Sequence, residues 1–364
     1  MSISRRVILG GLFASVSVVS LMACSKPKDE AQAPAGKTEF TIGWSIYAGW
    51  MPWPYAAQAG IVKKWADKYG LKINLLQIND YVESVNQFTA GKLDGVTVAS
   101  MDALTIPAAG GKDTTALIVG DYSNGNDGIV SKSAKTVAAL KGATVNLVEL
   151  SVSHYLLARA LETANLKLAD IKTVNTSDAD IVGAYASADV QNVATWNPQL
   201  GEVKKAPGSS LIFDSSKIPG EILDLLVVDT ALLVATPNLG KALVGIWFET
   251  MTVMSAKTPE GAAARAAMAS LSGTTPEDYE SQLSTTFMYY TPAEAVAAVT
   301  APAFAEATDR VRQFSFAQGL FGPGATSVDA IGISIPGGKV LGAANNVKLR
   351  FDSAYMQMAA DNKL

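Results

Sequence analysis

The chain has 364 residues and a formal net charge of −4, from 29 Lys and Arg against 33 Asp and Glu. This mildly acidic balance argues against nucleic-acid binding as the main task, because a basic patch is the usual footprint of that function. The single cysteine excludes internal disulfides, thiol catalysis and cysteine metal sites. The carboxylates show no calcium-loop spacing, so we expect neither a metal nor a cofactor.

The N-terminus has the pattern of an export signal. Arg5 and Arg6 precede an uncharged stretch that ends in Leu21-Met22-Ala23-Cys24. This end resembles the lipobox of bacterial lipoproteins, which implies a diacylglycerol on Cys24, and the paired arginines resemble a twin-arginine signal. A plain cleaved signal and an uncleaved anchor are the alternatives, although residues 7–23 are short for a membrane span. We expect 1–23 to be a signal peptide, and the exported protein to be held on a membrane without spanning it.

After a polar tether at 24–37, strand-like runs alternate with helical ones. The expected strands are 40–44, 71–78, 95–99 and 115–121, and the expected helices are 55–69, 82–90 and 102–109. This order predicts a parallel sheet with helices on both faces.

The rhythm restarts near residue 128. Strands are expected at 128–131, 144–147, 171–175, 192–195, 211–213 and 222–228, with helices at 136–141, 152–164 and 181–188. Four further helices, each opened by a proline, are expected at 237–257, 259–272, 276–283 and 292–312. We therefore predict an α/β fold of two lobes. Lobe 1 comprises 38–127 and 226–364 with a C-terminal helical extension, and lobe 2 comprises 128–225.

Several spaced segments resemble the nitrate/sulfonate/taurine-type solute-binding proteins of bacterial ABC importers. They are Gly43-Trp44-Ser45, Ala90-Gly91-Lys92-Leu93-Asp94, Ser151-Val152-Ser153-His154 and Thr195-Trp196-Asn197-Pro198. The resemblance implies a type II periplasmic binding fold hinged by two crossover strands. It also implies a monomer whose partners are a small solute and a permease with its cytoplasmic ATPase. Segments 121–125, 213–220 and 336–342 are most similar to the branch beside urea carboxylases, which is associated with guanidine use.

Ligands of open α/β sheets bind outside the carboxyl ends of strands, so residues there are the candidates for ligand binding. They are Trp44, Tyr47, Trp50, Asp102, Asp121 and Tyr122 in the first lobe, with Glu149, Ser151, Ser153, His154, Trp196, Asn197 and Asp224 after the crossover. Competing structural roles stay open: the aromatic rings can pack in the core, as we expect for Trp53, and Asp102 and the serines can cap helices.

Charge separates the ligand classes. Beyond Cys24 the chain has five arginines, at 159, 265, 310, 312 and 350, and none is expected at a strand end facing the cleft. A sulfonate, nitrate or phosphate site would be expected to use a bidentate arginine, although the helix N-terminus at Ser151 could also bind an anion. Acids and aromatic faces instead suit a small planar cation such as guanidinium.

The sequence therefore predicts a non-enzymatic receptor that captures a guanidinium-like solute. Urea, nitrate, taurine or another alkylsulfonate, and a thiamin-pyrimidine precursor are alternative ligands for the same receptor. An enzyme of thiamin-pyrimidine synthesis would share the fold, but one histidine and one cysteine count against that chemistry. A purely structural lipoprotein is the third class, and the aromatic residues at the strand ends argue against it.

Overall fold

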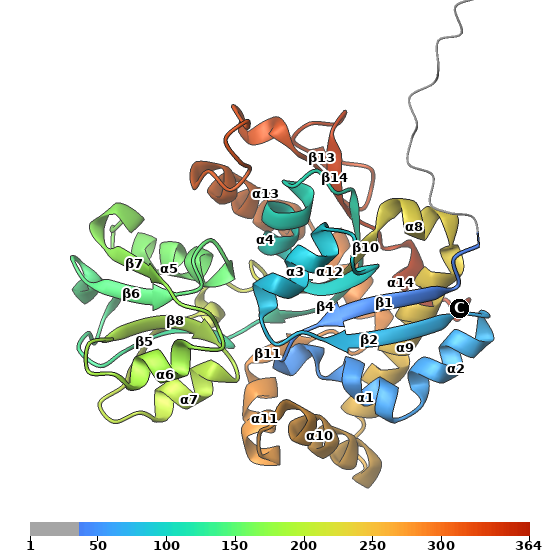
Figure 1. Cartoon of the computed structure of the whole chain (residues 1–364), viewed down its shortest axis with the longest axis horizontal. Coiled ribbons are helices and arrows are strands. Elements are labelled where there is room, and N and C mark those ends of the chain that lie inside the picture. Colours follow the sequence, from blue (N-terminus) through green and yellow to red (C-terminus); the bar gives the residue numbers. More distant parts are fainter. Residues whose placement is uncertain (1–35) are drawn as a thin grey trace, which may run out of the picture. The chain divides into compact units, whose positions relative to one another are not determined.

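The computed structural model describes residues 36–364 (Figure 1). The predicted signal peptide, the predicted lipidation site at Cys24 and the predicted tether up to residue 35 lie outside these residues. Within the described part, none of the helices combines the length and the apolar character that a membrane crossing needs.

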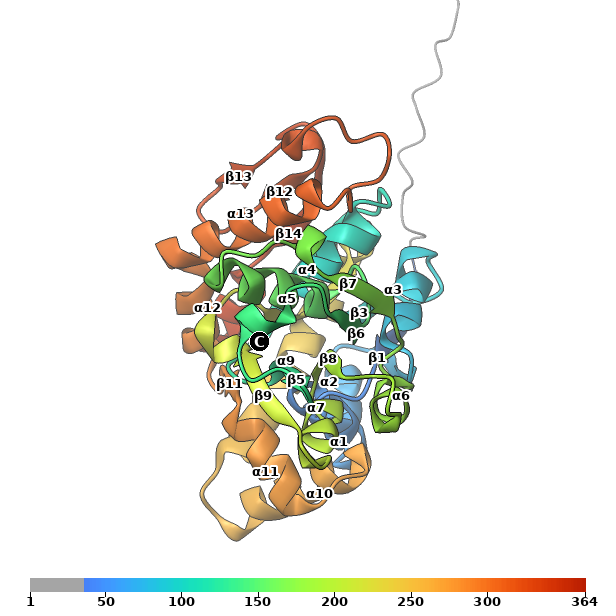
Figure 2. The same cartoon turned by 90° about the vertical axis from the view of Figure 1, so that its left-hand side faces the viewer.

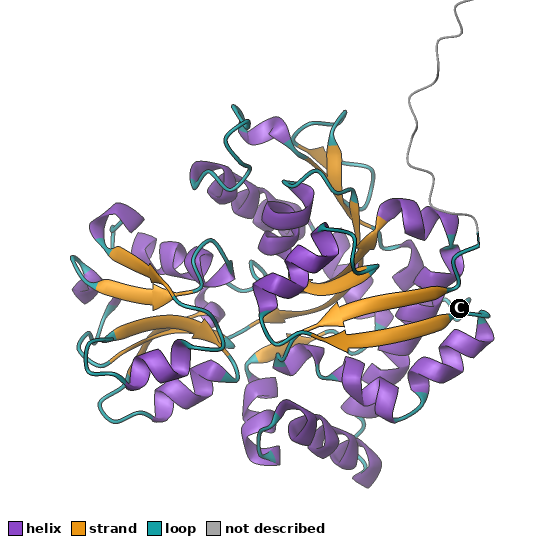
Figure 3. Cartoon of the chain, viewed as in Figure 1, coloured by secondary structure: helices purple, strands orange, loops and turns teal. Residues whose placement is uncertain are grey.

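Two separate sheets organise the described residues (Figure 3). The nine strands of the larger sheet are β1 (Glu39–Trp44), β2 (Lys72–Gln77), β3 (Gly95–Ala99), β4 (Thr114–Ser123), β10 (Leu223–Asp229), β11 (Thr286–Met288), β12 (Gly332–Ser334), β13 (Val340–Leu341) and β14 (Val347–Phe351). The smaller sheet has β5 (Asp127–Ser131), β6 (Thr144–Leu147), β7 (Lys172–Asn175), β8 (Asn192–Trp196) and β9 (Ser210–Asp214). The strand orders are β13-β12-β14-β4-β10-β3-β1-β2, with β11 on β4, and β7-β6-β8-β5-β9.

Helices cover both sheets. Those of the first half are α1 (Pro52–Gln58), α2 (Ile61–Lys68), α3 (Tyr81–Thr89), α4 (Ser100–Ala103), α5 (Val152–Thr163), α6 (Ile181–Ala186) and α7 (Gln199–Lys205). The later ones are α8 (Thr230–Ala235), α9 (Pro237–Ser255), α10 (Pro259–Ser272), α11 (Pro276–Ser284), α12 (Pro292–Thr300), α13 (Pro302–Ala317) and α14 (Ala354–Ala360). Helices α10 and α11 lie together at one end in both views (Figures 1 and 2). A π-helical stretch, Leu104–Ala108, continues α4.

The four strands predicted to form a parallel sheet, β1 to β4, do run in the same direction, but the larger sheet as a whole is mixed. Strand β1 is parallel to β2 and β3, but β10 returns from the smaller sheet and runs antiparallel between β3 and β4. Strands β3, β4 and β10 are almost entirely buried, which explains their near-continuous apolar sequences. The expected helix 55–69 is broken at Gly60, whose φ of 77° suits glycine. The expected helix 292–312 is two helices, because the second starts at Pro302.

Two short crossovers connect the sheets, and they are hydrogen-bonded to each other. The first follows β4 and leads into β5, and the second runs from β9 to β10. The hydroxyls of Ser123 and Ser215 lie 2.6 Å apart, and the amide of Gly125 donates to Ser215 Oγ at 2.8 Å. The residues at the start and end of these crossovers therefore lie close to one another.

Candidate ligand-binding site

A small cavity lies where the two sheets meet at the crossovers. Its volume, counted as the space open to the centre of a water molecule, is about 20 Å³, enough for about one water. The larger sheet and its helices contribute aromatic rings, the end of β3 and the start of β10, while β5, α5 and β8 close the other side. The lining residues are Tyr47, Trp50, Tyr81, Ala99, Asp127, Val152, Trp196, Ile222 and Asp224.

Two carboxylates face each other across the β4–β10 ladder at the cavity. Asp121 and Asp224 are directly opposite in this antiparallel pairing, so their side chains share one face of the sheet. Both are buried. The Tyr47 hydroxyl donates to Asp121 Oδ1 at 2.9 Å, and Asp121 Oδ2 has no partner among the described residues. Gly49 allows this arrangement, because a Cβ there would lie 2.5 Å from Asp121 Oδ2.

A third acid, Asp127, approaches from the smaller sheet. It is the first residue of β5, lies opposite Trp196 in the β5–β8 ladder and is buried. Its backbone amide donates to Ser123 Oγ at 3.1 Å, which holds it against the crossover. Sequence reasoning missed Asp127, because Gly125-Asn126-Asp127-Gly128 has the composition of a turn. An acid that directly precedes a buried strand was the available signal.

Burial is the main cause that raises the pKa of all three acids. The pKa of Asp127 rises to about 7, and desolvation together with the nearby carboxylates raises the pKa values of Asp121 and Asp224. Within residues 36–364, no Lys, Arg or His lines the cavity. The site therefore offers carboxylate acceptors and negative charge, which is the chemistry that binds a cation with N–H donors.

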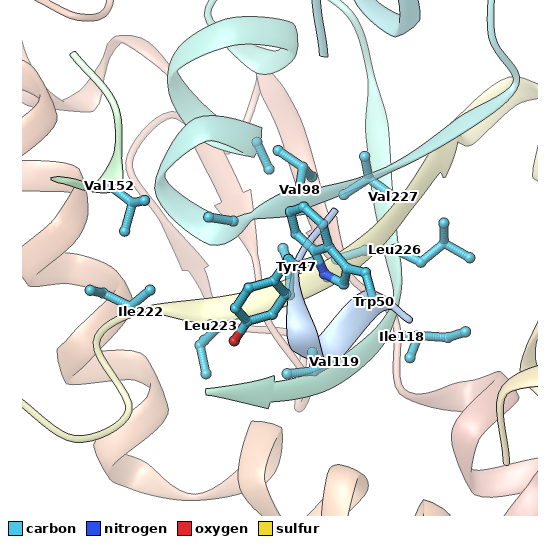
Figure 4. Close-up of a cluster of buried hydrophobic side chains, with 14 of the residues drawn as sticks. Tyr47, Trp50, Val98, Ile118, Val119, Val152, Ile222, Leu223, Leu226 and Val227 are labelled. Carbon is cyan, nitrogen blue, oxygen red and sulfur yellow. The ribbon is translucent and has the colours of Figure 1, made fainter. Parts of the chain in front are cut away.

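Aromatic rings form a continuous wall from one sheet to the other. The ring centroids of Tyr47 and Trp50 lie 5.0 Å apart, those of Trp50 and Tyr81 5.8 Å, and those of Tyr81 and Trp196 5.7 Å. Figure 4 shows Tyr47 and Trp50 together, with Val152 and Ile222 at one side of the cluster. Since the faces of aromatic rings attract cations, this wall complements the carboxylates.

The predicted site residues fall into three groups. Tyr47, Trp50, Trp196 and Asp224 line the cavity, and Asp121 contacts Tyr47 behind it. Trp44 is buried but does not line the cavity, and Tyr122 stacks on Phe287 at 4.7 Å, since successive strand residues point to opposite faces. Asn197 donates to Asn126 Oδ1 and accepts from the Gly201 amide, so both ends of its amide make contacts within the protein.

The remaining predicted residues lie beside the cavity and do not line it. Ser151 Oγ accepts from the Ser153 amide and donates to the Val148 carbonyl, as an N-cap of α5. His154 Nδ1 accepts from the Leu150 amide, and burial lowers the pKa of His154. The two remaining carboxylates accept hydrogen bonds within the protein: Glu149 accepts from the Thr173 hydroxyl, and Asp102 accepts from the Tyr81 hydroxyl at 2.6 Å. Trp53 packs on Trp247, as expected of a core residue.

Comparison with known proteins shows which fold the chain adopts and which family it belongs to. A candidate binding protein of Brucella abortus is 28% identical over 144 residues, which are 39% of this chain and 44% of that protein, so the match spans less than half of that relative. The alkanesulfonate-binding protein SsuA of Xanthomonas axonopodis pv. citri, solved with MOPS bound, superposes with a TM-score of 0.65 at 18% identity, over 79% of this chain and 96% of that one.

The periplasmic nitrate-binding protein NrtA of Synechocystis PCC 6803 superposes with a TM-score of 0.56 at 12% identity, over 90% of this chain and 99% of that one. These likenesses, together with the two mixed sheets, confirm the predicted α/β fold of the periplasmic binding type. The model of the NMT1-like family matches residues 33–271, which is more than half of the chain, so the chain belongs to the NMT1-like family.

Proposed function

We propose that the chain is a solute-binding receptor of a bacterial ABC importer, and that its cavity holds a small planar cation of the guanidinium type. The family and the fold support the receptor role. The observation that carries the ligand class is the group of three buried acids: Asp127 and Asp224 line the cavity, Asp121 lies directly behind it, and no basic residue lines it. The solved relatives are named for alkanesulfonate and nitrate. Those ligands are anions, and this cavity has the opposite charge.

The arginines support the same choice, because each is engaged elsewhere. An anion site would be expected to use bidentate arginine contacts. The five arginines within residues 36–364 all form ion pairs and none lines the cavity; the pairs are Arg159 with Glu162 and Glu221, Arg265 with Glu280, Arg310 with Glu221, Arg312 with Asp309 and Asp329, and Arg350 with Asp113. Binding a sulfonate or nitrate beside the buried acids would therefore lack charge compensation.

Guanidinium matches the chemistry of the site. Its N–H donors radiate in one plane toward carboxylates, while its two faces are left for aromatic rings. Urea is the second candidate, and one observation favours it: Trp50 Nε1 is buried without a partner and could donate to the urea oxygen. Urea brings no charge, so it would leave the buried acids to keep their protons.

The position of the acids suggests how binding and closure are linked. Asp121 precedes the first crossover, Asp127 follows it, and Asp224 follows the second crossover. The sequence-based bounds of 38–127 and 226–364 for lobe 1 and 128–225 for lobe 2 would put Asp127 and Asp224 in the opposite lobes, since β5 belongs to the smaller sheet and β10 to the larger one. We propose that the lobe built on the larger sheet and the lobe built on the smaller sheet close around the cation by a hinge motion at these crossovers. The receptor would be exported, held at the membrane through lipid on Cys24, and would deliver its solute as a monomer to a permease with its ATPase.

Calorimetric titration of the purified chain tests the ligand class. Guanidinium, urea, taurine and nitrate are titrated in turn, and we expect saturable binding of guanidinium. Asp224→Asn should weaken it at least tenfold, since a hydrogen bond to a charged group contributes about 1.5–3 kcal/mol. Asp229→Asn is the matched control, because Asp229 lies at the far end of the same strand and pairs with Lys112. Tight binding of taurine or nitrate without guanidinium binding would refute the proposal.

A further inference from the structure

A second and larger groove lies next to the cavity and shares no lining residue with it. Its volume on the same measure is about 350 Å³. It is bordered by α3, by α4 and its π-helical continuation, by the loop that precedes α5, and by the turn after α13. The side chains that matter for its chemistry are Asp102, Thr105, Ile106, Glu149, Leu150 and Leu320.

The polar side of this groove has unmet hydrogen-bonding capacity. Asp102 is 0% exposed, and its Oδ2 accepts from Tyr81, whereas its Oδ1 makes no hydrogen bond of normal geometry with the described residues, the backbone amide of Val152 being the nearby donor to this carboxylate. Thr105 Oγ1 is also buried without a partner. Glu149 supplies a second carboxylate, and no Lys, Arg or His of the described chain borders the groove. Leaving a carboxylate buried with one oxygen unsatisfied is costly, so a donor from a ligand would stabilise it.

The other side of the groove is apolar and includes a strained residue. Leu150 is 52% exposed and has a φ of 64°, a left-handed conformation that is unfavourable for a leucine. The Leu150 amide donates to His154 Nδ1 at 3.1 Å, which helps to hold this backbone in place. Strain of this kind persists where the surrounding structure enforces it, and it concentrates at binding and switch regions. Ile106 and Leu320 extend the apolar surface.

We propose that this groove is a second ligand site, which takes a short alkylammonium ion. The ammonium group donates to Asp102 Oδ1 and Thr105 Oγ1, and the alkyl chain lies along Ile106, Leu150 and Leu320. A cation with a hydrocarbon tail fits because the groove joins acids to apolar side chains. A metal ion fits less well, because no cluster of three or more His, Cys, Asp or Glu suited to a metal occurs in residues 36–364. The proposal stands independently of the guanidinium cavity.

Titration of n-butylammonium chloride into the full chain tests this site, first alone and then with guanidinium at saturation. We expect one equivalent to bind in both cases. Asp102→Asn should weaken n-butylammonium binding at least tenfold. Leu150→Gly should also weaken it, and this variant suits the left-handed backbone, so the fold is preserved. Glu202→Gln, an exposed acid on α7, is the control and should change nothing.

The outcomes distinguish this site from the cavity. Absence of n-butylammonium binding, its full displacement by guanidinium, or equal affinity in Leu150→Gly and the unmodified chain would each overturn the second site. Binding of n-butylammonium that depends on Asp102 and Leu150, in a chain that does not bind guanidinium, would support the second site while refuting the proposed function of the cavity.

Discussion

Binding of a small cation in the cavity should release protons, because burial disfavours the ionised acids of the free protein. The pKa of Asp127 is raised to about 7 by burial, and the pKa values of the cross-strand pair, Asp121 and Asp224, are raised as well. A bound cation favours ionised carboxylates, so these pKa values fall on binding and protons leave the site. Affinity for the cation should therefore increase with pH.

The size of the effect follows from the ionised fraction of the free carboxylate. For one acid with a pKa of about 7, this fraction is about nine tenths at pH 8 and about one hundredth at pH 5. If the cation requires that carboxylate to be ionised, affinity falls about a hundredfold between these two pH values, which corresponds to about 2.7 kcal/mol. The Asp121–Asp224 pair acts in the same direction.

The same shifts have the opposite effect on the ligand-free fold. Unfolded aspartates titrate near pH 4, so the folded state binds more protons than the unfolded state between about pH 4 and pH 7. The contribution of these acids to the free energy of unfolding therefore decreases as pH rises through this window. Thermal unfolding at several pH values should show a weaker decrease for Asp224→Asn than for the unmodified chain.

Calorimetry in two buffers measures the proton release directly. Guanidinium is titrated at pH 6 in phosphate and in Bis-Tris, two buffers with different ionisation enthalpies, and the difference between the two apparent enthalpies gives the number of protons released. We expect about one proton or more for the unmodified chain, fewer for Asp224→Asn, and an unchanged number for Asp229→Asn. Constant affinity from pH 5 to pH 8 without proton release would refute the reasoning, because the carboxylates would then be ionised before the cation binds.

Three further substitutions test the packing behind the site and an ion pair elsewhere in the fold. Gly49→Ala should abolish guanidinium binding in calorimetry and lower the free energy of unfolding by about 1–3 kcal/mol, since its Cβ would lie 2.5 Å from Asp121 Oδ2. Gly183→Ala, with open space around the new methyl, should leave both measurements unchanged or slightly raise stability; equal behaviour of the two variants would contradict the steric argument. Glu221→Gln should lower the midpoint of thermal unfolding, because Glu221 is buried and accepts from Arg159 at 2.8 Å. An unchanged midpoint would mean that this ion pair does not stabilise the fold.

Much of the fold is predictable from local patterns, because alternating strands and helices follow directly from apolar periodicity. The direction of β10 was not predictable in this way, since an antiparallel return strand has the same apolar sequence as a buried parallel one. The break at Gly60 was also missed, because one glycine within a helical pattern does not by itself end a helix.

The candidate site was predictable where a residue lies at the end of a strand of known direction. Asp121 and Asp224 meet because of the β4–β10 register, which places them directly opposite each other. Register depends on tertiary pairing, so the sequence indicated two separate acids but not a pair. Glu149 and His154 were expected in the same cleft, yet each makes a local contact beside it, with Thr173 and Leu150 respectively. Motif position alone does not distinguish a helix cap from a ligand contact.

The acids of the cavity connect ligand charge to the hinge in one step. Asp121 and Asp224 are neighbours within the larger sheet, and Asp127 belongs to the smaller sheet. In the proposed hinge closure, Asp127 therefore joins an existing pair of carboxylates in one buried space. Without a cation, that approach requires protonation or carries a desolvation penalty. A bound cation removes this penalty, because it compensates the charge of the buried carboxylates. In this proposal, the charge of the ligand therefore determines whether the closed arrangement is stable, more than its contact area does.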